Sequence, residues 1–178
     1  LRDSVVRVET EHGHGTGFLI DAERAIFATN KHVVVDEHLG KVYERVKVVF
    51  RDNGSFPDKN SFYATIIDVS IDKDLALLQA INAPAAQDLP FPLSIASSSV
   101  AEGQTVTVMG HPANEDFSVM HPRVSKVDED VIYLDGSDID RGCSGAPVIG
   151  QDNRVIGVVY GLGGDVQLRG RGVPIKYL

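Results

Sequence analysis

The chain has 178 residues, of which 43% are hydrophobic, enough for one domain or for two small, tightly joined halves with a well-filled core. Its formal net charge is −8, from 17 Lys and Arg residues against 25 Asp and Glu residues. Because an acidic surface repels phosphate backbones, we expect no nucleic-acid partner. The excess of acid either attracts a basic peptide or only keeps the protein soluble, and the sequence supports both interpretations.

The cysteine content bears on the cellular compartment of the protein, and the first residue bears on whether the sequence is part of a longer chain. Cys143 is the single cysteine, so no disulfide can form within the chain. No apolar run reaches membrane-spanning length, and no signal peptide is visible. These observations leave the compartment unknown. Because the first residue is Leu1 rather than Met, we expect a piece of a longer protein, with any regulatory domains or partner proteins outside this sequence.

Short apolar or alternating runs, separated by turn residues, predict β-strands along most of the chain. The expected strands are residues 4–9, 17–20, 25–29, 46–50, 62–69, 75–80, 105–109, 131–134 and 155–160. Many short strands at this spacing favour an all-β sandwich or barrel.

Helical signals are few. Residues 30–38 have room for one short helical turn, and Pro174 is a suitable residue to begin a helix at the end of the chain. Residues 82–98 are rich in Pro, Ala and Ser, which predicts a linker with a boundary near residue 90. The expected halves are therefore residues 1–90 and 91–178.

Ser144 lies in a glycine-rich turn and is a candidate nucleophile. A nucleophilic serine needs an exposed hydroxyl on a tight turn, with backbone N–H groups facing the developing oxyanion. Gly142 allows its own N–H and that of Ser144 to face one small space, and Gly145 allows close approach of a substrate. The alternative is an ordinary turn with no chemistry.

A serine nucleophile requires a base, and His32 is the best placed of the histidines. It follows an apolar strand, where the chain enters a loop and an imidazole would be held rigidly. His12 and His14 form a His-x-His pair in a glycine-rich stretch, but no cysteines or carboxylates are placed to complete a metal site. We therefore expect no metal and no cofactor.

The base in turn requires an acid that fixes its tautomer. Asp74 lies at the start of an apolar run, where a carboxylate is partly desolvated and still hydrogen-bonded. Asp68 and Asp72 are rivals, although Asp68 falls inside an expected strand and Asp72 in a turn.

Several short motifs together resemble the HtrA/Deg branch of the trypsin-like, chymotrypsin-fold serine peptidases. The matching stretches occur in the family's order and span nearly the whole chain: residues 15–20, 29–34, 74–78, 108–112, 139–145, 155–158 and 172–175. The resemblance implies an all-β fold of two six-stranded antiparallel β-barrels, packed together with the active site in the cleft between them. It also implies a catalytic triad of His32 and Asp74 from the first barrel and Ser144 from the second. The oxyanion hole would then consist of the N–H groups of Gly142 and Ser144.

The resemblance further indicates which residues form the substrate-binding pocket. The wall would be formed by Tyr160, Gly161 and Leu162, and the floor by Asp138, Ile139 and Asp140. An acid at position 138 would favour a basic residue before the scissile bond, whereas Ile139 in a reshaped loop would favour a small apolar one. Both preferences remain open.

Cys143 departs from the family pattern, which has Asn or Asp at this position. A thiol cannot pair with a freshly cut N-terminus, so we predict no activation switch of that kind. The position of the glycines argues against Cys143 as nucleophile, because the nucleophile should follow a glycine by two positions and Arg141 stands two positions before Cys143. The N-terminal segment lacks the aromatic cluster of HtrA trimers, and the oligomeric state is not predicted.

The function implied by these residues is hydrolysis of peptide bonds in protein or peptide substrates through an acyl-enzyme. One alternative is a catalytically silent peptide-binding module, a pseudoprotease. Another is a protease domain inside a larger sensing protein, active only when a partner orders its loops.

Overall fold

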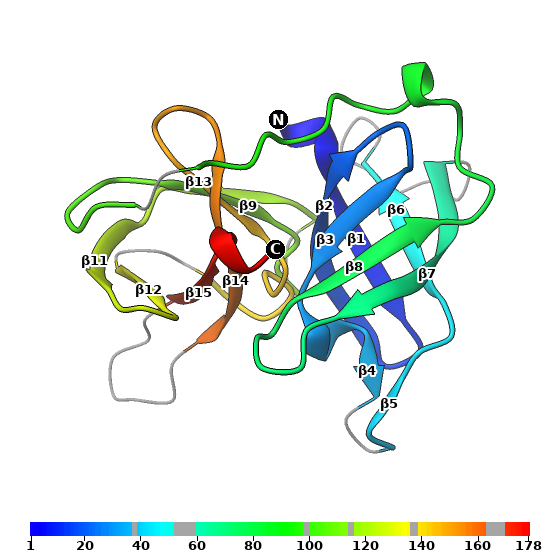
Figure 1. The fold of residues 1–178 in the computed structure, drawn as a ribbon, viewed down its shortest axis with the longest axis horizontal. Helices are drawn as coiled ribbons and strands as arrows, with labels where there is room; N and C mark the ends of the chain where they lie inside the picture. The colour runs from blue at the N-terminus through cyan, green and yellow to red at the C-terminus, as the bar shows by residue number, and fades with distance from the viewer. Residues whose placement is uncertain (37–38, 52–59, 98–99, 114–115, 136–138, 163–169) are drawn as a thin grey trace.

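The structure is a computed structural model, and it describes residues 1–36, 39–51, 60–97, 100–113, 116–135, 139–162 and 170–178. Two β structures lie side by side and are joined by an extended segment (Figure 1). No helix in these described ranges is long and apolar enough to cross a membrane.

The first β structure is a closed barrel with the strand order β1-β2-β3-β8-β7-β6, in which β6 pairs with β1 to close the ring. Its strands are β1 (Val5–Thr10), β2 (Gly13–Asp21), β3 (Ile26–Thr29), β6 (Val46–Phe50), β7 (Ser61–Val69) and β8 (Ala76–Ala80). A small separate hairpin, β4 (Val35–Asp36) and β5 (Lys41–Val42), follows β3 in the chain. Alternation along β1 directs Val6 and Val8 into the barrel core and leaves Val5 for the opposite face.

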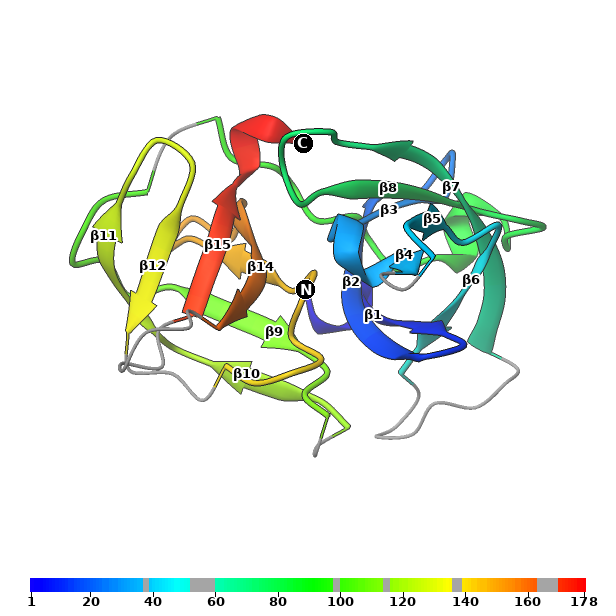
Figure 2. The same cartoon turned by 90° about the horizontal axis from the view of Figure 1, so that it is seen from below.

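The second β structure is a sheet with the order β10-β9-β13-β14-β15-β12-β11. Its strands are β9 (Thr107–Gly110), β10 (Ser118–Met120), β11 (Arg123–Val127), β12 (Ile132–Asp135), β13 (Pro147–Ile149), β14 (Val155–Leu162) and β15 (Gly170–Pro174). Figure 2 shows, from below, how this sheet curls beside the barrel.

The curl brings the two ends of the second sheet together. The segment just before β9 bonds to the start of β11: the Val106 N–H donates to the Pro122 carbonyl at 3.0 Å, and the Val124 N–H to the Gln104 carbonyl at 2.8 Å. Strands β10 and β11 lie on either side of Pro122. Because proline has no backbone N–H, it cannot donate a hydrogen bond to a neighbouring strand, and the pairing is interrupted there. The two strands are therefore two parts of one bent strand. This accounts for a sheet of seven named strands where a six-stranded barrel was expected.

An apolar cluster seals the junction between the two β structures. It combines Val5 and Phe18 of the barrel with Met109, Ile149 and Val158 of the sheet, all of which are buried. Removal of apolar surface from water contributes about 25 cal/mol of stability per Å². Burial of these side chains therefore stabilises the contact between the two halves. The cluster therefore favours one relative placement of the two halves.

The expected all-β architecture of two packed halves is confirmed, with the first half a closed six-stranded barrel and the second a curled, barrel-like sheet. The short turn expected within residues 30–38 is a 3₁₀ turn, Lys31–Val33, and the chain ends in a second one, Ile175–Tyr177. Further 3₁₀ turns occur at Arg2–Ser4 and Ala86–Asp88. Within the expected linker, the Leu93 N–H bonds to the Leu19 carbonyl of the barrel at 2.8 Å, so the segment is docked rather than loose. The boundary near residue 90 stays a prediction.

Candidate active site

His32 and Asp74 meet because their strands are neighbours. Strand β3 leads into the turn that holds His32, β8 begins two residues after Asp74, and Thr29 pairs with Ala76 across the two strands. One Asp74 carboxylate oxygen lies 2.6 Å from His32 Nδ1, and the other accepts the His32 backbone N–H at 2.9 Å. The Asn30 side-chain amide donates to the Asp74 carbonyl at 2.6 Å, which fixes the backbone of the acid as well.

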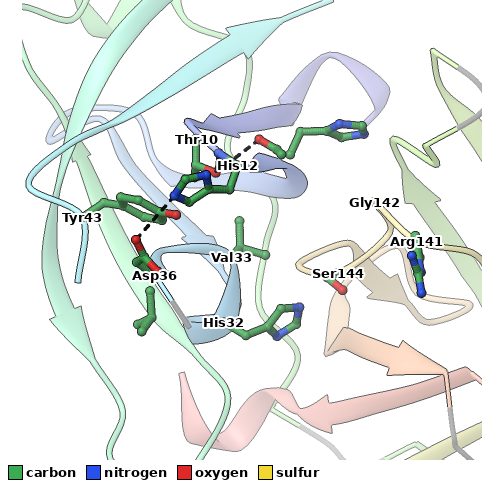
Figure 3. A pocket seen from close by; sticks show the side chains of 12 residues that line it. Thr10, His12, His32, Val33, Asp36, Tyr43, Arg141, Gly142 and Ser144 are labelled. Atoms are coloured by element: carbon green, nitrogen blue, oxygen red, sulfur yellow. Dashed lines mark hydrogen bonds and ion pairs between the residues drawn. The ribbon is translucent and has the colours of Figure 1, made fainter. Parts of the chain in front are cut away.

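This arrangement sets the tautomer of His32. Because a carboxylate only accepts hydrogen bonds, Nδ1 carries the proton and Nε2 is the basic nitrogen. Figure 3 shows His32 and Ser144 on facing walls of one pocket. Both hydrogen bonds described for His32 go to Asp74, so contact between Nε2 and the serine hydroxyl requires the closer approach that many active sites reach only with substrate bound.

The loop at Ser144 has two glycines in left-handed backbone conformations. Gly142 has φ +91° and Gly145 has φ +89°. A Cβ on Gly142 would lie 2.2 Å from the His111 carbonyl oxygen, and a Cβ on Gly145 would lie 1.9 Å from the Thr16 carbonyl oxygen. No side chain fits at either position, so the loop requires glycine for both its conformation and its packing.

The carbonyl groups of the loop determine where its N–H groups point. The Arg141 carbonyl accepts from the Ala113 N–H at 2.7 Å, and the Cys143 carbonyl accepts from the Ala146 N–H at 2.8 Å. In a trans peptide the N–H points opposite to the C=O. The N–H groups of Gly142 and Ser144 therefore point away from these donors, and neither has a backbone acceptor in the described chain.

Cys143 lies beside Ser144 but faces the other way. Its side chain is fully buried in the core of the second sheet, whereas Ser144 is partly exposed and lines the pocket. A buried thiol in apolar surroundings is a poor nucleophile because its thiolate is disfavoured and no substrate can reach it.

A Cys143→Ala variant is therefore expected to keep its reaction with a serine-directed probe close to the wild-type rate. Its free energy of unfolding should fall by about 1–2 kcal/mol, the usual range for removal of a buried atom. Probe kinetics and urea unfolding measure the two effects. Near-total loss of reaction in a folded variant would transfer the nucleophile role to Cys143.

The pocket between the two walls has a volume of about 310 Å³. Besides His32, Gly142 and Ser144, it is lined from the β1–β2 turn and from the segment around β4 and β5. His12 Nε2 lies 3.5 Å from an Asp36 carboxylate oxygen, and Tyr43 lies beside them (Figure 3). The sequence did not indicate that Asp36 and Tyr43 line the pocket, because neither stands in a recognisable motif. Only the fold brings them to it.

His14, the other histidine of the glycine-rich stretch, has a structural partner. The His14 ring bonds through Nε2 to the His111 carbonyl oxygen at 3.1 Å, which places it next to Gly142. Within the described ranges, no group of three His, Cys, Asp or Glu side chains is arranged to hold a metal ion.

Four of the expected substrate-pocket residues, Ile139, Asp140, Tyr160 and Gly161, do not line this cavity. Ile139 is buried against Gly170, and Tyr160 packs against the apolar cluster at the junction. Asp140 is exposed and holds the serine loop, since its carbonyl accepts the Cys143 N–H at 3.1 Å. Gly161 and Leu162 pair with β15 after a bulge in β14. Asp138 lies outside the described residues, and the pocket assignment stays a prediction.

His111 is a buried histidine beside the serine loop. Its Nδ1 lies 2.6 Å from the Asp116 carbonyl oxygen, and its ring packs against Phe117 at a centroid distance of 5.2 Å. Burial lowers the pKa of His111 from 6.5 to about 4, because the charged imidazolium is poorly solvated there. The folded protein therefore holds this ring neutral.

Stability should consequently depend on pH through His111. The unfolded chain takes up the proton near pH 6.5 and the folded chain only near pH 4, so the contribution is complete above pH 6.5 and is lost as the pH falls toward 4. The loss amounts to about 3 kcal/mol at most. Urea unfolding at pH 7, 5.5 and 4.5 should show a shallower decline for His111→Asn than for the wild type. Parallel declines would contradict this assignment.

Comparison with known proteins identifies the class that this fold and site define. The Trypsin-like peptidase domain family matches residues 15–158, and the chain belongs to that family.

Proteins similar to this chain include serine proteases of the HtrA type. Serine protease Rv3671c of Mycobacterium tuberculosis H37Rv is 30% identical over 162 residues, covering 83% of this chain and 36% of that protein. Serine protease HTRA1 of Xenopus tropicalis is 32% identical over 162 residues, covering 84% of this chain and 32% of that protein. The crystal structure of Rv3671c protease from M. tuberculosis in its active form superposes with a TM-score of 0.78 at 26% identity, covering 98% of this chain and 77% of that one.

The membership in the trypsin-like serine peptidases expected from the sequence is thus confirmed, and the resemblance to HtrA-type proteases is supported by these relatives. The chain spans about a third of the length of these two curated relatives.

Proposed function

We propose that this domain cleaves peptide bonds with Ser144 as nucleophile, His32 as general base and Asp74 as the residue that orients the base. The observation that carries the proposal is the pair of contacts between the Asp74 carboxylate and His32, one to the ring Nδ1 and one to the backbone N–H. Ser144 lies on the facing wall of the same pocket. A carboxylate that orients an imidazole toward a serine is the arrangement that general-base catalysis requires.

In the proposed reaction, His32 Nε2 takes the proton of the Ser144 hydroxyl as its oxygen attacks the substrate carbonyl carbon. Asp74 stabilises the resulting imidazolium and stays ionised. His32 then gives the proton to the leaving amine, and the peptide bond breaks to leave an acyl-enzyme. Water, deprotonated by the same nitrogen, hydrolyses the ester and restores Ser144.

The N–H groups of Gly142 and Ser144 are proposed to bind the oxyanion. Their orientation, opposite to carbonyls that are bonded elsewhere, supports this role. Such donors stabilise charge that develops only in the transition state, and removal of one typically costs about 10²–10³ in turnover.

The substrate is proposed to be a polypeptide, with the residue before the scissile bond chosen by Asp138, Ile139, Asp140 and the segment at positions 160–162. Basic and small apolar residues remain the two candidates for that position. A peptide library varied at this residue decides between them. An unchanged profile in Asp138→Ala would rule out selection of basic residues by that carboxylate.

The domain is further proposed to be the regulated protease part of a larger protein. The support is the greater length of its curated relatives, of which it matches about a third. Comparison of turnover between this domain and the full-length protein tests regulation. Equal turnover in both would argue against it.

The test of the proposed chemistry is reaction with a fluorophosphonate probe, followed by peptide mapping of the adduct. We expect a single adduct on Ser144, with none in Ser144→Ala. The absence of any adduct in both the folded domain and the full-length protein would favour a pseudoprotease.

A further inference from the structure

Thr16 is a fully buried residue of β2 that makes hydrogen bonds across the junction of the two β structures. Its hydroxyl lies 2.7 Å from the Gly142 carbonyl oxygen and 3.0 Å from the His111 backbone nitrogen. Its backbone N–H donates to the Ser144 carbonyl at 2.7 Å. A single side chain and its own peptide group therefore hold the nucleophile loop at two points.

The direction of the two hydroxyl bonds is fixed by their partners. The His111 N–H can only donate, so the hydroxyl oxygen of Thr16 accepts from it. The Gly142 carbonyl can only accept, so the hydroxyl proton of Thr16 goes to it. The hydroxyl therefore donates one hydrogen bond and accepts another. Rotation of the side chain away from this position would break both bonds.

The hydrogen bond to the Gly142 carbonyl restricts the conformation of the loop, because glycine has no side chain that limits its φ and ψ angles. The loop needs glycine there, yet glycine has the greatest backbone freedom of any residue. The peptide before Gly142 is held by the bond from Ala113 to the Arg141 carbonyl. The peptide after Gly142 is held by Thr16 at its carbonyl and by Asp140 at the Cys143 N–H. Thr16 thus holds one side of the flexible residue whose N–H faces the expected oxyanion.

Thr16 also connects the loop to the wall that carries the base. The Thr29 hydroxyl donates to the Thr16 carbonyl at 2.6 Å, and Thr29 is the last residue of β3, just before the turn that holds His32. The two facing walls of the pocket therefore share one anchoring residue.

We propose that Thr16 is a positioning residue whose hydroxyl keeps the Gly142 and Ser144 N–H groups aligned for the oxyanion. This inference rests on the proposed function of Ser144 as nucleophile. Its contribution is to the chemical step rather than to substrate binding, because the Thr16 side chain is buried and does not line the pocket.

The test separates the chemical step from binding by measuring the inactivation rate constant kinact and the affinity constant KI for a fluorophosphonate probe. The phosphoryl oxygen of the probe occupies the oxyanion position as the bond to Ser144 forms. Thr16→Val keeps the shape and removes the hydroxyl, and we expect kinact to fall by about tenfold or more with KI nearly unchanged. Thr16→Ser restores the hydroxyl and should return kinact close to the wild-type value.

Ser4→Ala is the matched control for a general loss of stability. Ser4 is also buried, and its hydroxyl donates to the Phe91 carbonyl at 2.6 Å outside the pocket. This variant should lose stability with little change in kinact. If Thr16→Val does not fold, Thr16→Ala replaces it in the comparison with Thr16→Ser.

The outcomes separate the two proposals. Wild-type kinact in a folded Thr16→Val or Thr16→Ala would overturn the role of Thr16, and so would an equal loss in Thr16→Ser. No reaction of the wild type itself would instead overturn the proposed function.

Discussion

Asp74→Asn is expected to lower kcat by about 10⁴ while the protein stays folded. An asparagine oxygen can still accept the His32 backbone N–H, now 2.9 Å from the carboxylate. The side-chain amide then faces Nδ1, 2.6 Å from the present carboxylate oxygen, and donates to it. The proton of the ring moves to Nε2, and His32 can no longer take the proton of Ser144. The geometry survives, but the tautomer is wrong.

The measurement is steady-state turnover of a peptide substrate, with circular dichroism as the check on folding. Asp72→Asn is the matched control, because Asp72 is exposed and only two residues away. It should retain turnover near the wild-type value. A comparable loss in both variants would indicate a general electrostatic effect, and unchanged turnover in Asp74→Asn would remove Asp74 from the site.

Gly145→Ala is expected to have the largest effect on folding. Its added methyl group would clash most severely with the Thr16 carbonyl oxygen, at 1.9 Å, and with the Thr29 hydroxyl oxygen, at 2.4 Å. The first is backbone in the middle of β2 and cannot move without breaking strand pairing. With the added strain of φ +89°, we expect a loss of about 4 kcal/mol or more and a fall in Tm of about 10 °C.

Gly40→Ala separates the clash from the backbone strain. Gly40 also has positive φ, at +61°, and no atom of the described residues lies within 4 Å of its Cβ position. Thermal unfolding should show a loss of only about 1 kcal/mol for this variant. Equal losses in the two variants would mean that strain alone, and not the contact with Thr16, accounts for the cost.

Local pattern predicted much of the fold. The alternation in β1 and the apolar runs of β6 and β8 are strong signals, because their side chains pack into one barrel core. The hairpin of β4 and β5 and the bent strand at Pro122 were not predicted. The β4–β5 hairpin has only two residues in each strand, too few for a periodic signal, and the bend at Pro122 depends on the curl of the second sheet rather than on its own residues.

The residues of the candidate site also differ in how far local sequence could predict them. His32, Asp74 and Ser144 stand in short motifs whose chemistry requires particular neighbours, so the sequence was enough to select them. Thr16 could be placed only in a glycine-rich strand. Its partners are 95 and 126 residues away, at His111 and Gly142, and no local pattern encodes bonds over such separations.

The apolar cluster at the junction bears on when during synthesis the domain could become active. Val173 and Ile175, near the end of the described chain, are buried in that cluster with Val5, near its start. A chain emerging from the ribosome lacks these residues until almost the whole domain has been made. We therefore expect the two walls of the pocket to come into register only after most of the described strands have been synthesised, so that the proposed peptidase activity would arise late in synthesis.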